Sequence, residues 1–210
     1  MIKTEKQRDL WVITLARPEK ANSLTGAMLG ELAALAKAAA VENVKALILT
    51  GEGRVFSAGA DLDEARAGLA VDPVWEQLSN QLANLPCLTI AALNGTLAGG
   101  AFGMALACDI RLAVPGAKFF YPVMKLGFLP QPSDPARLAA LIGPARAKMI
   151  LMGGQKIEAA EAQTWGLIDR IVPEQSLIDT ARGLAADTLA ATPEHLAAIK
   201  RMCGTNQGSR

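Results

Sequence analysis

Residues 94–109, with the sequence NGTLAGGAFGMALACD, carry the pattern that best indicates the fold class of this chain. They follow an apolar run at residues 87–93 and pass through small residues into an alanine-rich segment that ends near Cys108. This order is typical of a strand, a glycine-containing turn and a helix. Such a turn lets the backbone approach a ligand closely, and the N-terminus of the helix directs free N–H groups towards it. We therefore expect a binding loop around Gly99 and Gly100.

A second loop of the same design lies upstream. Residues 56–62, FSAGADL, follow the apolar run 44–50 and precede a short helix that we expect to begin near Asp61. Two backbone amides, one from each loop, would form an oxyanion hole if they converged on a single oxygen. Each loop alone is also explained as a tight turn between a strand and a helix. Neither has the glycine spacing of the phosphate loop or of the dinucleotide-binding fingerprint, so nucleotide binding through those motifs is not expected.

Along the rest of the chain, strands alternate with helices before the pattern becomes helical. We predict strands at residues 10–15, 44–50, 87–93 and 110–114, and helices at 24–40, near 61, at 74–85, up to about 108 and repeatedly after 133. A nearly continuous apolar strand such as VKALILT at 44–50 is typical of a sheet covered on both faces. The alternation predicts an α/β fold.

The composition excludes several classes of protein. The chain has 210 residues, 51% hydrophobic and 20% charged, which suits a folded domain with a sizeable core. Its 21 Lys and Arg against 20 Asp and Glu do not favour nucleic-acid binding. With one histidine and three scattered cysteines, we expect neither a metal site nor a disulfide framework. The polar first residues and the lack of a long apolar run predict a cytoplasmic protein with no membrane segment.

Together, the motifs resemble the crotonase family, also called the enoyl-CoA hydratase/isomerase superfamily. The resemblance covers roughly residues 10–200 and rests on ordered landmarks: residues 15–24 (LARPEKANSL), the two glycine loops, residues 119–127, Arg137-Leu138 and residues 159–172. It implies a crotonase-like spiral of ββα units, a homotrimer or hexamer, and an acyl-CoA thioester as substrate with no separate cofactor. It also implies a core at residues 1–190, followed at 191–210 by a C-terminal helix and polar tail that are short for the family.

The resemblance assigns site residues as well. The two oxyanion amides would belong to Ala60 and Gly100, which agrees with the interpretation of the two loops from their residues. The positions expected to bind the substrate, including its coenzyme A part, are Lys20, Ala21, Ala58, Gly59, Asp61, Leu62, Gly99, Tyr121 and Val123.

The catalytic pattern of the family is not kept. Hydratases of the family use two glutamates, and the aligned residues here are Gly103 and Val123. Some isomerases and a dehalogenase branch use an aspartate where this chain has Gln131. The candidate replacement is Asp134, in the loop that borders the acyl pocket of the family, because an apolar pocket raises a carboxyl pKa. The alternative is a helix cap, since Ser133 or Asp134 can accept from free backbone N–H groups.

Other reactive side chains have plainer explanations. Tyr121 either donates a hydrogen bond to substrate or packs half-buried. Asp63 and Glu64 serve the dipole of the helix after the first loop, because acidic residues stabilise a first turn. His195 is expected on the surface and Cys108 in the core.

Two functions of different classes remain. The first is an acyl-CoA-processing enzyme of the hydratase/isomerase type with an atypical acid/base group, and hydrolysis or decarboxylation on the same scaffold stays open. The second is a catalytically inactive acyl-CoA-binding protein or subunit that keeps the scaffold, which Gly103 and Val123 would explain.

Overall fold

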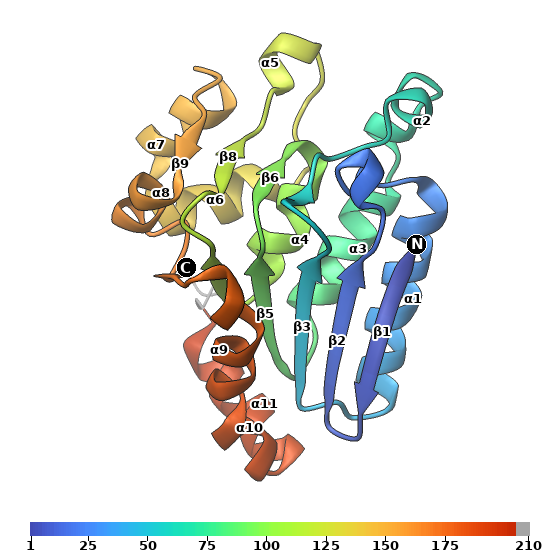
Figure 1. Ribbon diagram of the computed structural model, residues 1–210, viewed down its shortest axis with the longest axis vertical. Coiled ribbons are helices and arrows are strands. Elements are labelled where there is room, and N and C mark those ends of the chain that lie inside the picture. The colour runs from blue at the N-terminus through green and yellow to red at the C-terminus, as the bar shows by residue number, and fades with distance from the viewer. Residues whose placement is uncertain (205–210) are drawn as a thin grey trace, which may run out of the picture.

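Two β-sheets organise the chain in the computed structural model, which describes residues 1–204 (Figure 1). The larger has the order β1-β2-β3-β5-β7-β10 and the smaller the order β4-β6-β8-β9. The strands are β1 (Ile2–Gln7), β2 (Leu10–Leu15), β3 (Ala46–Gly51), β4 (Val55–Ser57), β5 (Leu88–Leu93), β6 (Thr96–Ala98), β7 (Ile110–Ala113), β8 (Lys118–Phe120), β9 (Ile157–Glu158) and β10 (Arg170–Ile171).

Consecutive strands are shared between the two sheets. After β2, the pairs β3–β4, β5–β6 and β7–β8 each send their first strand to the larger sheet and their second to the smaller one. Neighbours within β2, β3, β5 and β7 are parallel, as are neighbours within β4, β6 and β8. Each pair is followed by helix. This is the expected spiral of ββα units.

Helices cover the sheets and fill the C-terminal part. In Figure 1, α1, α3 and α4 lie behind the larger sheet, and α9 to α11 lie at its lower left. The helices are α1 (Gly26–Val41), α2 (Leu62–Arg66), α3 (Val74–Ala83), α4 (Phe102–Ala107), α5 (Val123–Leu126), α6 (Asp134–Ile142), α7 (Pro144–Leu151), α8 (Ala159–Trp165), α9 (Leu177–Leu184), α10 (Ala186–Ala190) and α11 (Pro193–Cys203). None of the helices in the described part is long and apolar enough to cross a membrane.

The main strands and helices agree with the sequence prediction to within a few residues, and the differences have physical reasons. Strand β1 escaped prediction because it is an edge strand whose Lys and Glu side chains face solvent. Strands β4, β6 and β8 have three residues each, too few to show a period. The helix expected within residues 191–210 is α11, and the expected polar tail at 205–210 lies outside the described residues.

The smaller sheet is anchored by aromatic side chains. Phe56 of β4 and Phe119 of β8 are fully buried, and so is Phe102 at the start of α4. Burying one such side chain contributes about 1.5–3 kcal/mol. The burial of these rings anchors the short strands in the core, and with them the loops that follow β4 and β6.

Candidate active site

The parallel strands of the smaller sheet bring distant parts of the chain to one edge. Ser57 of β4 pairs with Leu97 of β6, which pairs with Phe119 of β8. Because parallel strands end on the same side of a sheet, the residues after each strand meet there. They are Ala58 to Ala60, Gly99 and Gly100, and Tyr121.

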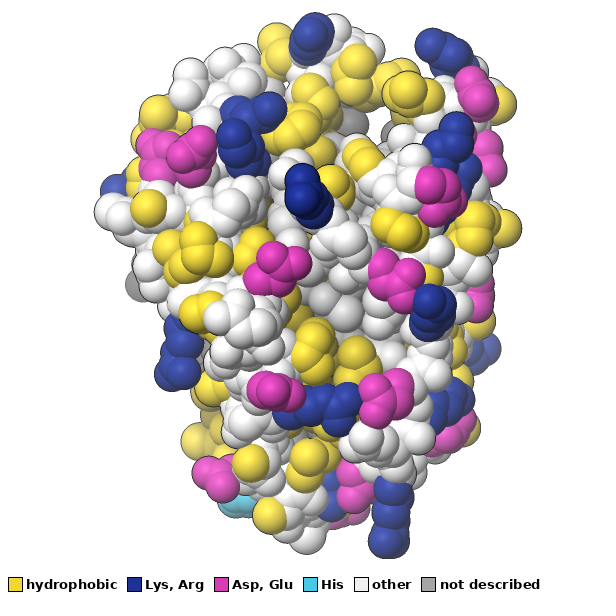
Figure 2. All heavy atoms as spheres, viewed as in Figure 1, with side chains coloured by type: hydrophobic (Ala, Val, Ile, Leu, Met, Phe, Trp, Pro, Cys, Tyr) yellow, Lys and Arg dark blue, Asp and Glu magenta, His cyan; other side chains and the backbone are white. Residues whose placement is uncertain are grey.

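A cavity of about 130 Å³ opens at this edge. No charged side chain of the described residues lines it. Figure 2 shows hydrophobic side chains gathered at the top of the molecule, in the region of α5, where Leu126 and Leu129 are exposed. The lining residues are Ala58, Ala60, Leu62, Ala65, Ala70, Trp75, Gly99, Gly100, Tyr121, Pro122, Val123, Leu126, Phe128, Leu129 and Gln131.

The two glycine loops contact each other through their backbones. A Cβ built on Gly59 would lie 3.0 Å from the carbonyl oxygen of Ala98 and 3.5 Å from the amide nitrogen of Gly100. Both Gly59 and Gly99 have positive φ angles, 94° and 58°, that other residues rarely adopt. Glycine at both positions is therefore what allows the loops to approach so closely.

The geometry leaves the amides of Ala60 and Gly100 without an acceptor among the described residues. Leu24 donates to the oxygen of Gly59 (2.8 Å) and accepts from the nitrogen of Asp61 (2.9 Å). In such a parallel bridge, the N–H of the intervening Ala60 points away from Leu24. Gly100 is the second residue of a 3₁₀ turn, Gly99–Ala101, where an N–H has no partner within the turn.

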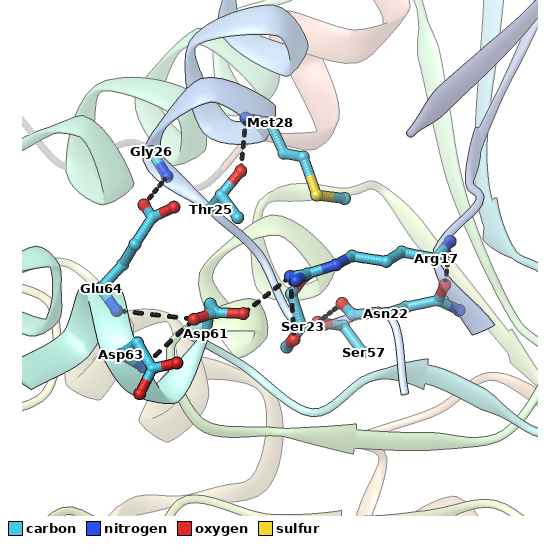
Figure 3. Close-up of polar contacts among 10 residues, drawn as sticks. All are labelled: Arg17, Asn22, Ser23, Thr25, Gly26, Met28, Ser57, Asp61, Asp63 and Glu64. Carbon is cyan, nitrogen blue, oxygen red and sulfur yellow. Dashed lines mark hydrogen bonds and ion pairs between the residues drawn. The ribbon is translucent and has the colours of Figure 1, made fainter. Parts of the chain in front are cut away.

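A buried asparagine holds the first loop in place (Figure 3). The side chain of Asn22 accepts from the nitrogen of Arg17 (2.8 Å) and donates to the oxygens of Glu52 (2.9 Å) and Val55 (2.7 Å). The backbone carbonyl of Asn22 accepts from the Ser57 hydroxyl at 2.8 Å. Asn22 has a φ of 50°, a conformation that asparagine tolerates better than most residues. The segment before α1 is thereby tied to the end of β4.

The carboxylate of Asp61 contacts other groups of the protein and does not line the cavity. It caps α2 by accepting from the nitrogens of Asp63 and Glu64, and it pairs with Arg17 at 2.8 Å (Figure 3). The hydrogen bond from Arg17 lowers the pKa of Asp61 below its usual value. Glu64, expected only to serve the dipole of its own helix, also reaches the nitrogen of Gly26 at the start of α1 (2.7 Å). These contacts orient the helix that follows Ala60.

Asp134 is fully buried behind the cavity wall. One carboxyl oxygen accepts from the hydroxyl of Tyr121 at 3.0 Å, and the other has no hydrogen-bond partner in the described structure. A Cβ built on Gly103 would lie 3.0 Å from that second oxygen. The carboxylate thus sits beside Gly103 of α4, although it comes from α6.

The capping explanation for this segment is wrong. Ser133 is the N-cap of α6 and makes no side-chain capping bond; its hydroxyl donates to Glu76 at 2.6 Å. Asp134 follows as a helical residue with its carboxyl turned inward. Arg137 of the same helix bonds Ser79 and Asn80 of α3, which fixes α6 against α3.

Burial controls the proton affinity of this carboxyl. Desolvation raises the pKa of Asp134 to about 7, although the Tyr121 hydrogen bond and the charge of Arg137 act in the opposite direction. Burial, together with the nearby Asp134 carboxylate, raises the pKa of Tyr121 far above its usual value, so its phenol stays protonated. Tyr121 is buried rather than half-buried and links Asp134 to the cavity that it lines.

The structure brings some of the residues expected at the site to the cavity and leaves others outside it. Ala58, Ala60, Leu62, Gly99, Gly100, Tyr121 and Val123 line it. Gly59 does not line the cavity but lies against the backbone of Ala98 and Gly99. The carbonyl of Ala21 accepts from the nitrogen of Ala58 at 3.0 Å. Lys20 is exposed, and Asp61 and Asp134 do not form part of the wall.

Sequence reasoning missed Trp75. Its ring lies against Gly100, where a built Cβ would be 3.2 Å from two of the ring carbons. Trp75 lies at the start of a predicted helix, where an aromatic residue is most simply explained as part of the hydrophobic core. No signal in the sequence therefore distinguished it from other core residues. His195 is exposed near the start of α11 and Cys108 is buried, as expected, and burial raises the pKa of the Cys108 thiol to about 12.

Stacked spiral sheets with a two-loop cavity at the edge of the smaller one define a crotonase-type protein, and comparison with known proteins agrees. The profile of the enoyl-CoA hydratase/isomerase family matches residues 5–207. The chain belongs to that family.

Relatives and solved structures give the same picture. The chain is 34% identical over 189 residues to 1,2-epoxyphenylacetyl-CoA isomerase of Escherichia coli, covering 85% of this chain and 72% of the relative. It resembles the crystal structure of enoyl-CoA hydratase from Bacillus anthracis with a TM-score of 0.88 at 33% identity, over 95% of this chain and 81% of that one. A structure from Thermobifida fusca in complex with CoA gives a TM-score of 0.88 at 29% identity, over 99% of this chain and 86% of the other.

Proposed function

We propose that this protein is an enzyme that forms and reprotonates the enolate of an acyl-CoA thioester. The amides of Ala60 and Gly100 would hold the thioester oxygen, and Asp134 would carry the proton. The observation that supports this most is the pair of unpartnered amides on two loops in backbone contact, next to a buried carboxyl whose pKa lies near 7.

The chemistry assigns each group one task. Removing a proton from the α-carbon breaks a C–H bond, and its electron pair moves onto the thioester oxygen. Two N–H donors fixed before the reaction stabilise that charge, and one such donor is typically worth about 10²–10³ in rate. A carboxyl with a pKa near the working pH both accepts and returns a proton efficiently. Because Asp134 does not line the cavity, the Tyr121 hydroxyl would relay the proton: its oxygen accepts the proton from the α-carbon while its own proton passes to the Asp134 carboxylate, and the reverse transfer returns a proton to carbon.

One carboxyl favours the isomerase side of the family's chemistry. Moving a proton from one carbon to another needs a single group that takes and returns it. Water addition in the family uses two glutamates, and the residues that the resemblance aligns with them are Gly103 and Val123. The isomerase relative from Escherichia coli is consistent with this preference.

The test measures the incorporation of deuterium at the α-carbon of the thioester. Wild-type protein, Asp134→Asn and the control Asp179→Asn, an exposed carboxylate on α9, are incubated in heavy water with short, medium and aromatic acyl-CoA and enoyl-CoA thioesters. Mass spectrometry reads α-carbon deuterium and double-bond position. We expect exchange or migration with wild type and the control, and a loss of about 10²–10⁴ with Asp134→Asn.

Each other outcome has a definite meaning. Full activity of Asp134→Asn removes that residue from the mechanism. Thioester binding by the wild-type protein without exchange or new product supports the inactive acyl-CoA-binding alternative. Release of free coenzyme A would instead indicate hydrolysis.

A further inference from the structure

An indole ring lines the cavity next to Gly100. Trp75 is almost fully buried, and its ring carbons approach Gly100 closely. The indole nitrogen donates to the carbonyl oxygen of Leu69 at 2.8 Å, which fixes the ring in its plane. Trp75 is therefore a rigid wall beside the position where the acyl group of a bound thioester begins.

The wall encloses an apolar space of limited size. Among the described residues that line the cavity, the polar side-chain groups are the Trp75 N–H, the Tyr121 hydroxyl and the Gln131 amide, and none of them carries a charge. The first two donate to Leu69 and Asp134, and the Gln131 amide nitrogen lies 3.5 Å from the oxygen of Ala70. A charged acyl substituent would therefore meet no opposite charge in this lining, and burying an unpaired charge is unfavourable.

The volume of the cavity matches a compact acyl group. At about 130 Å³, the cavity is close to the roughly 150 Å³ apolar cavity that is known to accept benzene. It therefore suits one six-membered ring or a short aliphatic group of similar volume.

We propose that Trp75 is the residue that sets acyl specificity, and that the substrates are thioesters of compact apolar acyl groups, about the size of one aromatic ring. This inference rests on the proposed function, because it assumes that the acyl group lies against Gly100. Long aliphatic acyl groups are excluded by the indole, and charged ones by the lining.

The experiment measures binding rather than turnover. Isothermal calorimetry gives the Kd of coenzyme A and of its acetyl, butanoyl, hexanoyl, phenylacetyl, dodecanoyl and succinyl thioesters for the full chain. We expect affinity to rise about fourfold per methylene up to the hexanoyl and phenylacetyl thioesters, from about 0.8 kcal/mol per buried methylene. Dodecanoyl should bind no better than hexanoyl, and succinyl no better than acetyl.

Variants then test the indole itself. Trp75→Leu should move the optimum towards longer chains, so that dodecanoyl binds at least tenfold better relative to hexanoyl than in wild type. Trp75→Phe is a milder change that keeps an aromatic wall, and it should give a smaller shift in the same direction. The matched control is Trp165→Leu on α8, away from the cavity, and it should leave the order of affinities unchanged.

The outcomes separate this inference from the proposed function. If neither coenzyme A nor any thioester binds, the proposed function fails. If thioesters bind with affinities that ignore acyl size, or that keep rising to dodecanoyl, the acyl specificity is wrong while the proposed function stands. If the order of affinities is as expected but unchanged in both Trp75 variants, the assignment to Trp75 is wrong.

Discussion

Gly103 and Asp134 form a complementary pair at the scale of single residues. The carboxyl of Asp134 fills the space beside α4 that any side chain at position 103 would enter. Although alanine favours helices over glycine, a Cβ at 103 would press on a carboxyl that Tyr121 holds in place. The glycine at this position is thus tied to the aspartate.

This pairing predicts opposite effects for two glycine-to-alanine changes in helices. Gly30→Ala, at an exposed position of α1 where a Cβ meets nothing within 4 Å, should stabilise the protein by about 0.5–1 kcal/mol. Gly103→Ala should destabilise it by about 1–3 kcal/mol through overpacking. Urea unfolding of both variants measures the difference. Equal stabilisation by the two changes would show that Asp134 moves aside freely.

The raised pKa of Asp134 predicts a pH-dependent stability. Between pH 3.8, the ordinary pKa of an aspartate, and about pH 7, the unfolded chain has lost this proton and the folded protein keeps it. The contribution of Asp134 is therefore fully present below pH 4, is lost as the pH rises to 7, and changes no further above that. In the wild-type protein the free energy of unfolding should fall by on the order of 4 kcal/mol over this range. Asp134→Asn should remove this fall and be more stable than the wild type at pH 8. Urea unfolding of both proteins at pH 4 and pH 8 measures this fall, and an equal change of stability with pH in the two proteins would contradict the prediction.

At the scale of elements, the Asn22 hydrogen bonds join the segment before α1 to the end of β4. Their removal in Asn22→Ala leaves buried backbone groups unpaired and should cost about 3 kcal/mol. Asn43→Ala is the matched control, since Asn43 is exposed and has a similar φ of 54°. It should cost about 1 kcal/mol for the left-handed backbone alone. Thermal or urea unfolding that gives equal losses would mean that the hydrogen bonds contribute nothing.

The elements also show what a sequence reveals and what it hides. The apolar runs of β2, β3, β5 and β7 and the glycine turns were predictable, because both are local patterns. The contact of Asp134 with Gly103 joins two helices far apart in the chain, and no local pattern encodes it. For the same reason the sequence indicated Asp134 as a candidate but could not separate a buried carboxyl from a helix cap.

The whole molecule combines a well-buried sheet with a smaller sheet of very short strands. The amides of the central strands β3 and β5 should therefore exchange with heavy water far more slowly than those of β4 and β6. The amides of Ala60 and Gly100 should exchange rapidly in the free protein and become protected when a thioester occupies the cavity. Hydrogen-exchange mass spectrometry or NMR reads both, and unchanged exchange at residues 60 and 100 on ligand binding would argue against the oxyanion pair.

The contact between the two glycine loops has a consequence for redesign. The groups proposed to hold the thioester oxygen belong to the main chain, and their spacing is set by backbone lying against backbone at Gly59 and Gly99. The walls around them are side chains from other elements, such as Trp75 and Leu126. A library that varies such wall residues while keeping the two glycines would therefore change the substrate preference and leave the oxyanion-binding amides in place. The backbone that holds the thioester oxygen and the side chains that select the acyl group belong to different residues.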